Sequence, residues 1–185
     1  MTQKEFKDIS IRGRVAYCIN CLNNYLKAIY PDSDYSSVID LACKITENSN
    51  YIDESTMAFT EIIPEYLYEF DNYEDAEFEY ITKEQYDSFI RIIPKDDADL
   101  NTIMHSIRDI VWEYCYTSID EGAKKNLKFI INTVDVLKSK KISIPDIDEY
   151  KKFIFSKNDG WGDYISRDEY LNTHASHIKN GCEPS

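Results

Sequence analysis

The chain has 185 residues, of which 43% are hydrophobic and 30% are charged, and its formal net charge at pH 7 is −13. This length and composition are typical of one globular domain with a sizeable core, and they exclude a disordered chain. The sequence pI near 4.6 argues against direct binding to nucleic acid or to an anionic membrane, because both are negatively charged.

The scarcity of glycine and proline, five of each, favours helices joined by short loops. We therefore expect an all-α fold, a single-domain bundle of about seven or eight helices over residues 1–185, with residues 180–185 as a frayed tail. No apolar run is long enough for a transmembrane helix, and the N-terminus is too polar for a signal peptide. The five cysteines lack the spacing of a disulfide framework. Together with the two preceding observations, this predicts a cytoplasmic protein with reduced thiols.

Periodic apolar positions, breaks at proline or glycine, and capping residues predict the helices in chain order. The expected ranges are 11–30, 35–48, 53–63, a turn over 64–70, 82–93, about 96–114, a helix after Gly122 carrying Leu127 to Leu137, 145–155, and 166–178. Thr82 with Gln85, and Ser166 with Glu169, have the spacing of capping boxes. A weak alternation at 141–144 is the only plausible strand.

Negative charge is concentrated between Lys44 and Lys83, where 38 residues hold eleven Asp and Glu and no Lys or Arg. This stretch accounts for −11 of the net charge of −13, and it also holds eight tyrosines and phenylalanines. Negative charge steers the encounter with a basic partner, and aromatic side chains supply buried contact area. The alternative is a solvated acidic face on a soluble domain.

Within this stretch, Glu61, Glu65 and Glu69 would form one ridge if a helix continued through Pro64. Residues 71–79 have no helical period and are predicted to form an acidic loop. We expect residues 65–80 to contact the partner and residues 47–61 to add to the negative electrostatic field that attracts it. The predicted contact residues, acids that pair with Lys or Arg and tyrosines that act as anchors, are Glu65, Glu69, Asp71, Tyr73, Glu74, Asp75, Glu77 and Tyr80.

Two groups of residues have the composition of metal or redox sites. Cys18 and Cys21 form a CxxC pair, but zinc CxxC motifs lie on turns and need a second ligand pair, whereas these lie inside a periodic helix. Core packing is the favoured interpretation. His174, His177 and Cys182 cluster near the C-terminus, where no fourth ligand is evident and a frayed tail explains them equally well.

Catalytic signals are weak. His105 precedes Asp109 by one helical turn, as in an oriented general base, but the spacing places no nucleophile beside the pair. The segment 159–162 is too short and too acidic in its flanks to cradle phosphate, and Trp161 is expected to plug the core. Nucleotide-binding, EF-hand, metalloprotease and serine-hydrolase motifs are absent, as is the Glu-x-x-His of di-iron sites. We therefore expect no metal, no cofactor and no enzymatic activity.

Three short passages carry a resemblance to a known family. They are GRVAYCINCLNNYL at 13–26, WEYCYTSIDEG at 112–122 and the pair Trp161-Gly162. They resemble parts of an all-helical family of immunity proteins from bacterial polymorphic-toxin systems. The first passage is similar to the first helix of that family, the second is similar to its central Tyr-rich helix, and the third is similar to its late Trp-Gly pair. The acidic balance and size also resemble this family, which has no catalytic motif to transfer.

The resemblance implies a protein made beside a toxin, which it binds so as to occlude the active site or substrate path. Many such toxins are nucleases with basic surfaces, so an acidic protein can mimic the charge of nucleic acid. The expected partner is thus a cognate toxin with a basic surface. Two other hypotheses stay open: a generic interaction or regulatory module that uses an apolar helix groove, and a helical enzyme that uses carboxylates and a metal. The oligomeric state is also left open.

Overall fold

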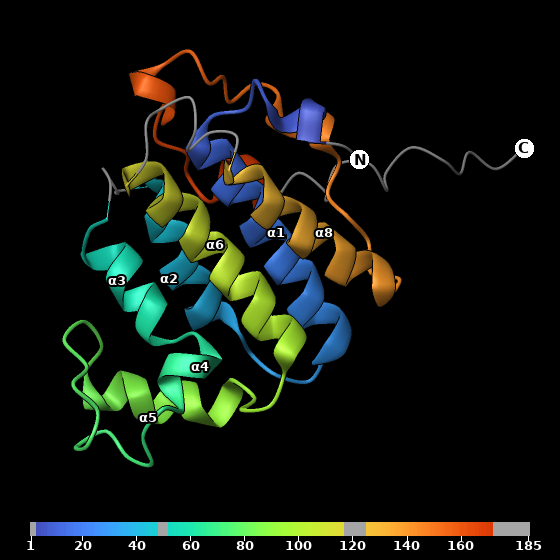
Figure 1. Ribbon diagram of the computed structural model, residues 1–185. Helices are drawn as coiled ribbons and strands as arrows, with labels where there is room; N and C mark the ends of the chain where they lie inside the picture. The colour runs from blue at the N-terminus through green and yellow to red at the C-terminus, as the bar shows by residue number, and fades with distance from the viewer. Residues whose placement is uncertain (1–2, 48–51, 117–124, 172–185) are drawn as a thin grey trace, which may run out of the picture.

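The computed structural model of the chain describes residues 3–47, 52–116 and 125–171. Within these ranges it contains eight α-helices and no β-strand, which confirms the predicted all-α fold (Figure 1). The helices are α1 (Ile11–Ile29), α2 (Ser36–Glu47), α3 (Glu54–Glu61), α4 (Pro64–Leu67), α5 (Lys83–Ile92), α6 (Ala98–Tyr116), α8 (Leu127–Ser139) and α9 (Asp168–Leu171). Short 3₁₀ helices are η1 (Gln3–Phe6), η2 (Ile147–Tyr150) and η3 (Asn158–Gly160).

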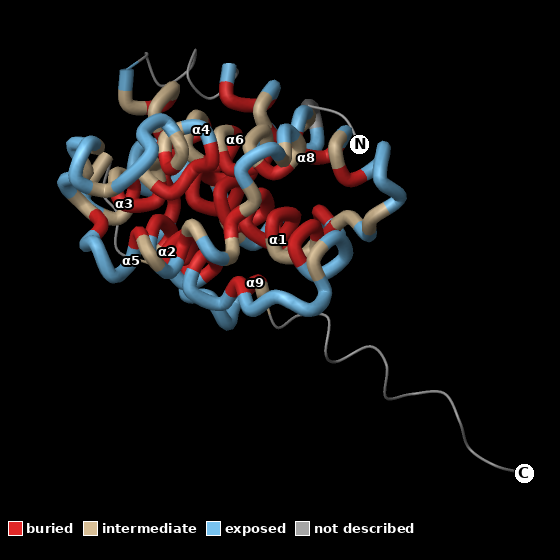
Figure 2. Tube along the Cα trace, turned by 90° about the horizontal axis from the view of Figure 1, so that it is seen from below, coloured by how far each residue is buried: buried red, intermediate tan, exposed pale blue. Residues whose placement is uncertain are grey.

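Helix α1 is the central element of the bundle. It packs against α2, α6 and α8, and fourteen of its 19 residues are buried. Other parts of the protein therefore surround α1 along most of its length, up to its C-terminal turn. Figure 2 shows the same arrangement, with buried residues at the centre and exposed residues on the outer turns. Helices α3 and α4 also pack against α6. Helix α5 lies at one end of the molecule beside α4 (Figure 1).

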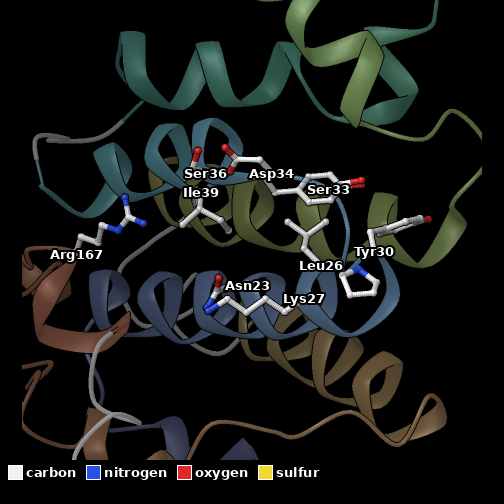
Figure 3. A pocket seen from close by; sticks show the side chains of 11 residues that line it. Asn23, Leu26, Lys27, Tyr30, Ser33, Asp34, Ser36, Ile39 and Arg167 are labelled. Carbon is white, nitrogen blue, oxygen red and sulfur yellow. The ribbon is translucent and has the colours of Figure 1, made fainter.

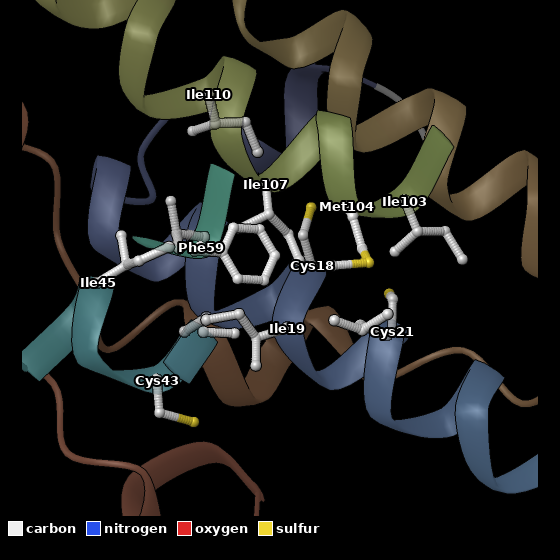
Figure 4. Packing of buried hydrophobic residues seen from close by; sticks show 14 of the residues in the cluster. Cys18, Ile19, Cys21, Cys43, Ile45, Phe59, Ile103, Met104, Ile107 and Ile110 are labelled. Carbon is white, nitrogen blue, oxygen red and sulfur yellow. The ribbon is translucent and has the colours of Figure 1, made fainter. Parts of the chain in front are cut away.

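The core is built from aliphatic, aromatic and cysteine side chains of α1, α2, α3 and α6 (Figure 4). Cys18 and Cys21 are both fully buried free thiols, which confirms the core-packing interpretation. Burial raises the pKa of the Cys18 thiol to about 12, so it stays protonated at neutral pH. Trp161 is also buried as expected, with its ring edge-on to Tyr114 at a centroid distance of 5.5 Å.

Capping hydrogen bonds mark the starts of α2 and α5, close to where the sequence predicts them. The Asp34 carboxylate accepts the Ser36 amide at 2.9 Å and so caps the start of α2. Thr82 and Gln85 form the complete capping box of α5. Pro64 occupies the first turn of a separate α4, where its missing amide hydrogen has no cost. Because the chain is not helical at the junction before Pro64, the continuous Glu61–Glu65–Glu69 ridge does not form.

The predicted helix at 145–155 is wrong, since only η2 forms there. The reason is a long-range pairing: the Ser10 amide donates to the Phe153 carbonyl at 2.7 Å and the Phe155 amide donates to the Asp8 carbonyl at 2.9 Å. These bonds hold 153–155 extended against the N-terminal segment, where Ile9 and Ile154 form an isolated bridge. Among the described residues of the last predicted helix, only Asp168–Leu171 is helical, and His174, His177, Cys182 and the tail at 180–185 lie outside the described residues.

The predicted strand at 141–144 is also wrong, because the chain turns there directly after the end of α8 and forms no β-strand. Lys141 has a φ of 59°, the Lys141 amide donates to the Lys138 carbonyl at 3.0 Å, and the Ile142 amide donates to the Leu137 carbonyl at 2.9 Å. This is the Schellman arrangement, in which glycine usually occupies the left-handed position.

Replacing Lys141 with glycine should therefore stabilise the protein. The left-handed conformation costs a lysine about 1–2 kcal/mol, and the greater freedom of glycine in the unfolded chain offsets about half of this gain. We expect Lys141→Gly to raise the free energy of unfolding by about 0.5–1 kcal/mol in urea titrations. The matched control, Lys138→Gly in the last turn of α8, should lower it by about 1 kcal/mol, and equal effects of both would contradict this account.

Asp97 connects the end of α1 to the start of α6. Its carboxylate accepts the Tyr30 hydroxyl at 2.6 Å, the Tyr25 hydroxyl at 2.8 and 2.9 Å, and the Leu100 amide at 2.9 Å. Burial, followed by the hydrogen bond to Asp97, raises the pKa of both tyrosines, so both stay protonated donors. Asp97 is thus the N-cap of α6 and the acceptor for Tyr25 of α1 and for Tyr30, which directly follows α1.

Candidate partner-binding surface

Residues 68–82, which we call the acidic loop, connect α4 to α5 at one end of the molecule (Figure 1). Seven of the eight predicted contact residues lie in it, and only Glu65 lies outside, on α4. The segment contains no helix, as the unperiodic sequence predicts. Most of its side chains are exposed or half-buried, whereas Ile81 at its end is 3% exposed and belongs to the core.

An aromatic cluster forms the base of the acidic loop. The Tyr73, Phe78 and Tyr86 rings lie within 5.5–5.8 Å of one another, and the Tyr73 hydroxyl donates to the Ile81 carbonyl at 3.1 Å. Tyr86 belongs to α5, so this cluster attaches the loop to that helix. Tyr73, predicted as a partner anchor, is therefore engaged within the chain.

Two of the predicted acids within the loop also have internal partners. The Glu74 carboxylate lies 2.7 Å from the Lys83 Nζ, and this hydrogen bond lowers the pKa of Glu74. Asp75 exchanges two hydrogen bonds with Asn72: the Asn72 side-chain amide donates to its carboxylate at 2.6 Å, and the Asp75 backbone amide donates to the Asn72 side-chain oxygen at 3.0 Å. The Glu74 contact joins the loop to α5, the Asp75 contacts close a turn within the loop, and both side chains stay exposed.

Glu65 is tied to α6. Its carboxylate lies 2.7 Å from His105 Nε2, and its backbone amide donates to the Asn101 side-chain oxygen at 3.1 Å. The Asp109 carboxylate instead accepts two hydrogen bonds from Arg108 at 2.6 and 2.8 Å. The structure therefore does not bring His105 and Asp109 together as an acid–base pair, and the His105 partner comes from a different helix.

The remaining acids of the loop point to solvent. Among the described residues, the carboxylates of Glu69, Asp71, Glu77 and Glu79 make no hydrogen bond or ion pair. Phe70 lies between two of them and is 43% exposed, an unusual position for a phenylalanine. Phe70 and Glu79 are not among the predicted contact residues, although the sequence places Phe70 between the predicted residues Glu69 and Asp71. The loop thus presents exposed acids together with an exposed aromatic ring.

A second aromatic surface runs along the outside of α6. The Arg108 guanidinium lies 5.6 Å from the Tyr66 ring and 5.8 Å from the Trp112 ring, and the Trp112 and Tyr116 rings lie 5.7 Å apart. The Arg108 Nη1 also donates to the Tyr66 hydroxyl at 2.6 Å. Tyr116 is 73% exposed, so this row ends in a freely accessible ring.

A cavity of about 290 Å³ lies between α1 and α2 (Figure 3). Leu26 and Ile39 form its apolar floor, and Lys27, Asp34 and Arg167 lie around it. Arg167 is already paired with the Asp40 carboxylate. The charges around the cavity have both signs, so they select neither an anion nor a cation. Within the described residues, no group of three His, Cys, Asp or Glu is positioned to hold a metal ion.

No family model, curated protein or solved structure matches the chain. None of the described helices is long and apolar enough to cross a lipid bilayer.

Proposed function

We propose that the chain is a non-enzymatic cytoplasmic immunity protein that binds and neutralises a cognate bacterial toxin with a basic surface, such as a nuclease. The observation that carries the proposal is the acidic loop, where Glu69 and Asp71 flank the exposed Phe70 along the chain. Their carboxylates and those of Glu77 and Glu79 have no partner among the described residues. Charge and aromatic area in one place suit a basic protein partner better than they suit a small substrate.

The mechanism follows from the placement of these groups. Long-range attraction between the acidic loop and a basic surface raises the association rate, and the effect weakens as salt screens the charges. Burial of Phe70 and the half-buried Tyr80 then slows dissociation, because most affinity differences arise in the dissociation rate. A partner held in this way has its phosphate-binding surface covered, and its substrate is excluded.

The direct experiment pairs the chain with the toxin domain encoded beside its gene. We expect co-expression to protect cells from that domain and the two proteins to co-purify at low salt. Absence of a complex, together with unprotected growth, would contradict the proposal. Catalytic activity of the isolated chain, or a stoichiometric bound metal in the purified protein, would favour the enzyme hypothesis instead.

A second candidate function is an interaction or regulatory module that binds its partner through the aromatic row on α6. The exposed Tyr116 beside Trp112 and Arg108 favours it, because Trp, Tyr and Arg are the residue types enriched at binding hot spots. Partner binding that is insensitive to salt and is lost in Tyr116→Ala, while charge reversal in the acidic loop has no effect, would support this function over the first.

A further inference from the structure

The end of α3 is joined to the far end of the acidic loop by one carboxylate. Glu61 accepts three successive backbone amides: the Glu79 amide at 2.8 Å on Oε1, the Tyr80 amide at 3.0 Å on Oε2, and the Ile81 amide at 2.9 Å on Oε2. Hydrogen bonds to a charged acceptor are roughly twice as strong as neutral ones. Three of them on one side chain fix the path of the backbone where the loop returns to the core.

The same short segment is held from its other side. The Ile81 carbonyl accepts the Tyr73 hydroxyl at 3.1 Å, so residue 81 is bonded through both its amide and its carbonyl. The Ile81 side chain is buried, and Thr82 begins the capping box of α5 directly after it. Glu61 therefore fixes the loop to α3, while Tyr73 and the capping box fix it to itself and to α5.

We propose that Glu61 is a positioning residue that clamps the acidic loop in the conformation that binds a basic protein partner. This inference rests on the proposed function and adds to it a residue that holds the binding loop in place. A loop that is already ordered loses little conformational entropy when it binds, so the clamp raises affinity without contacting the partner. Glu61 then acts through the backbone of 79–81 rather than as part of a diffuse negative field.

The test compares two variants that remove the same charge from the same helix. Glu61→Gln keeps the size of the side chain but retains one oxygen acceptor and places an amide group against backbone donors. Glu54→Gln, at the exposed first turn of α3, is the matched control. Hydrogen exchange of the amides of residues 79, 80 and 81 should accelerate about tenfold or more in Glu61→Gln, because a charged hydrogen bond closes each of them, and should be unchanged in Glu54→Gln.

Exchange of α1 core amides, such as that of Ile19, is the internal reference. It should be the same in both variants, because the clamp acts locally. Equal exchange of 79–81 in the two variants, or acceleration throughout the core of Glu61→Gln, would overturn the clamp. This arm needs no partner, so it decides the clamp even if the wild-type chain binds no toxin and the proposed function fails.

The second arm measures affinity for the toxin domain encoded beside the gene. Glu61→Gln should bind about tenfold more weakly than Glu54→Gln, since the loop must be ordered during binding. Faster exchange at 79–81 with equal affinities of the two variants would overturn the positioning role while leaving the proposed function intact. Glu61→Asp, whose shorter side chain carries the charge but does not reach all three amides, should resemble Glu61→Gln in both arms.

Discussion

Replacing Asp97 with alanine should lower the free energy of unfolding by about 3 kcal/mol. The substitution removes the N-cap of α6 and leaves the hydroxyls of Tyr25 and Tyr30 without their acceptor. The cap contributes about 1 kcal/mol. Loss of the acceptor costs more at Tyr25, whose side chain is buried, than at Tyr30, whose side chain is more exposed and can bond to water. For a chain of this size the loss corresponds to a fall in Tm of roughly 6–12 °C.

Thermal and urea unfolding followed by circular dichroism measure this change. Asp96→Ala is the matched control, because Asp96 is the neighbouring exposed aspartate, and it should change the free energy of unfolding by less than about 0.5 kcal/mol. Asp97→Asn should lie between the two, since one oxygen remains to accept a hydrogen bond. If Asp97→Ala and Asp96→Ala unfold alike, the connection between α1 and α6 does not depend on this carboxylate.

Reversing two charges in the acidic loop should slow association with the toxin domain by about tenfold to a hundredfold at low salt. Asp71→Lys with Glu77→Lys is the variant to use, because both side chains are exposed and lack internal partners among the described residues. Glu74 and Asp75 are unsuitable, since changing them also removes the contacts with Lys83 and Asn72. Stopped-flow or surface-capture kinetics measure the rate.

The matched control places the same charge change elsewhere. Asp32→Lys with Asp135→Lys alters two exposed aspartates outside the loop. Each reversal adds two charges, so both double variants carry −9 where the wild type carries −13. The control should slow association only by the effect of net charge, and equal slowing in both variants would remove the loop from the binding site.

Much of the fold was predictable because helices are specified by local signals. The apolar period of α1, the Asp34 cap and the Thr82–Gln85 box each depend on residues no more than four positions apart. The same reasoning failed at 145–155, where backbone groups pair with residues 8–10 from the other end of the chain. A local pattern carries no information about that pairing.

The candidate site was predictable in place but not in detail. Charge density and the lack of a helical period located the acidic loop. They could not separate Glu74 and Asp75, which have internal partners, from Glu69 and Asp71, which have none within the part of the chain that the structure describes. The role of Glu61 depends on the return of the chain 18–20 residues later, and that return is set by tertiary packing. The sequence likewise places several acids around the start of α6, and only the hydrogen bonds from Tyr25 and Tyr30 distinguish Asp97 from the others.

The most direct test of the central claim is the association rate constant of the wild-type chain with the toxin domain encoded beside its gene, measured across a salt series. The Debye length falls from about 30 Å at 0.01 M to about 3 Å at 1 M ionic strength, so a steered encounter must slow steeply over this range. The account predicts that steep fall, and a flatter dependence for the Asp71→Lys, Glu77→Lys variant. A rate constant that stays the same across the series would contradict binding through the acidic loop.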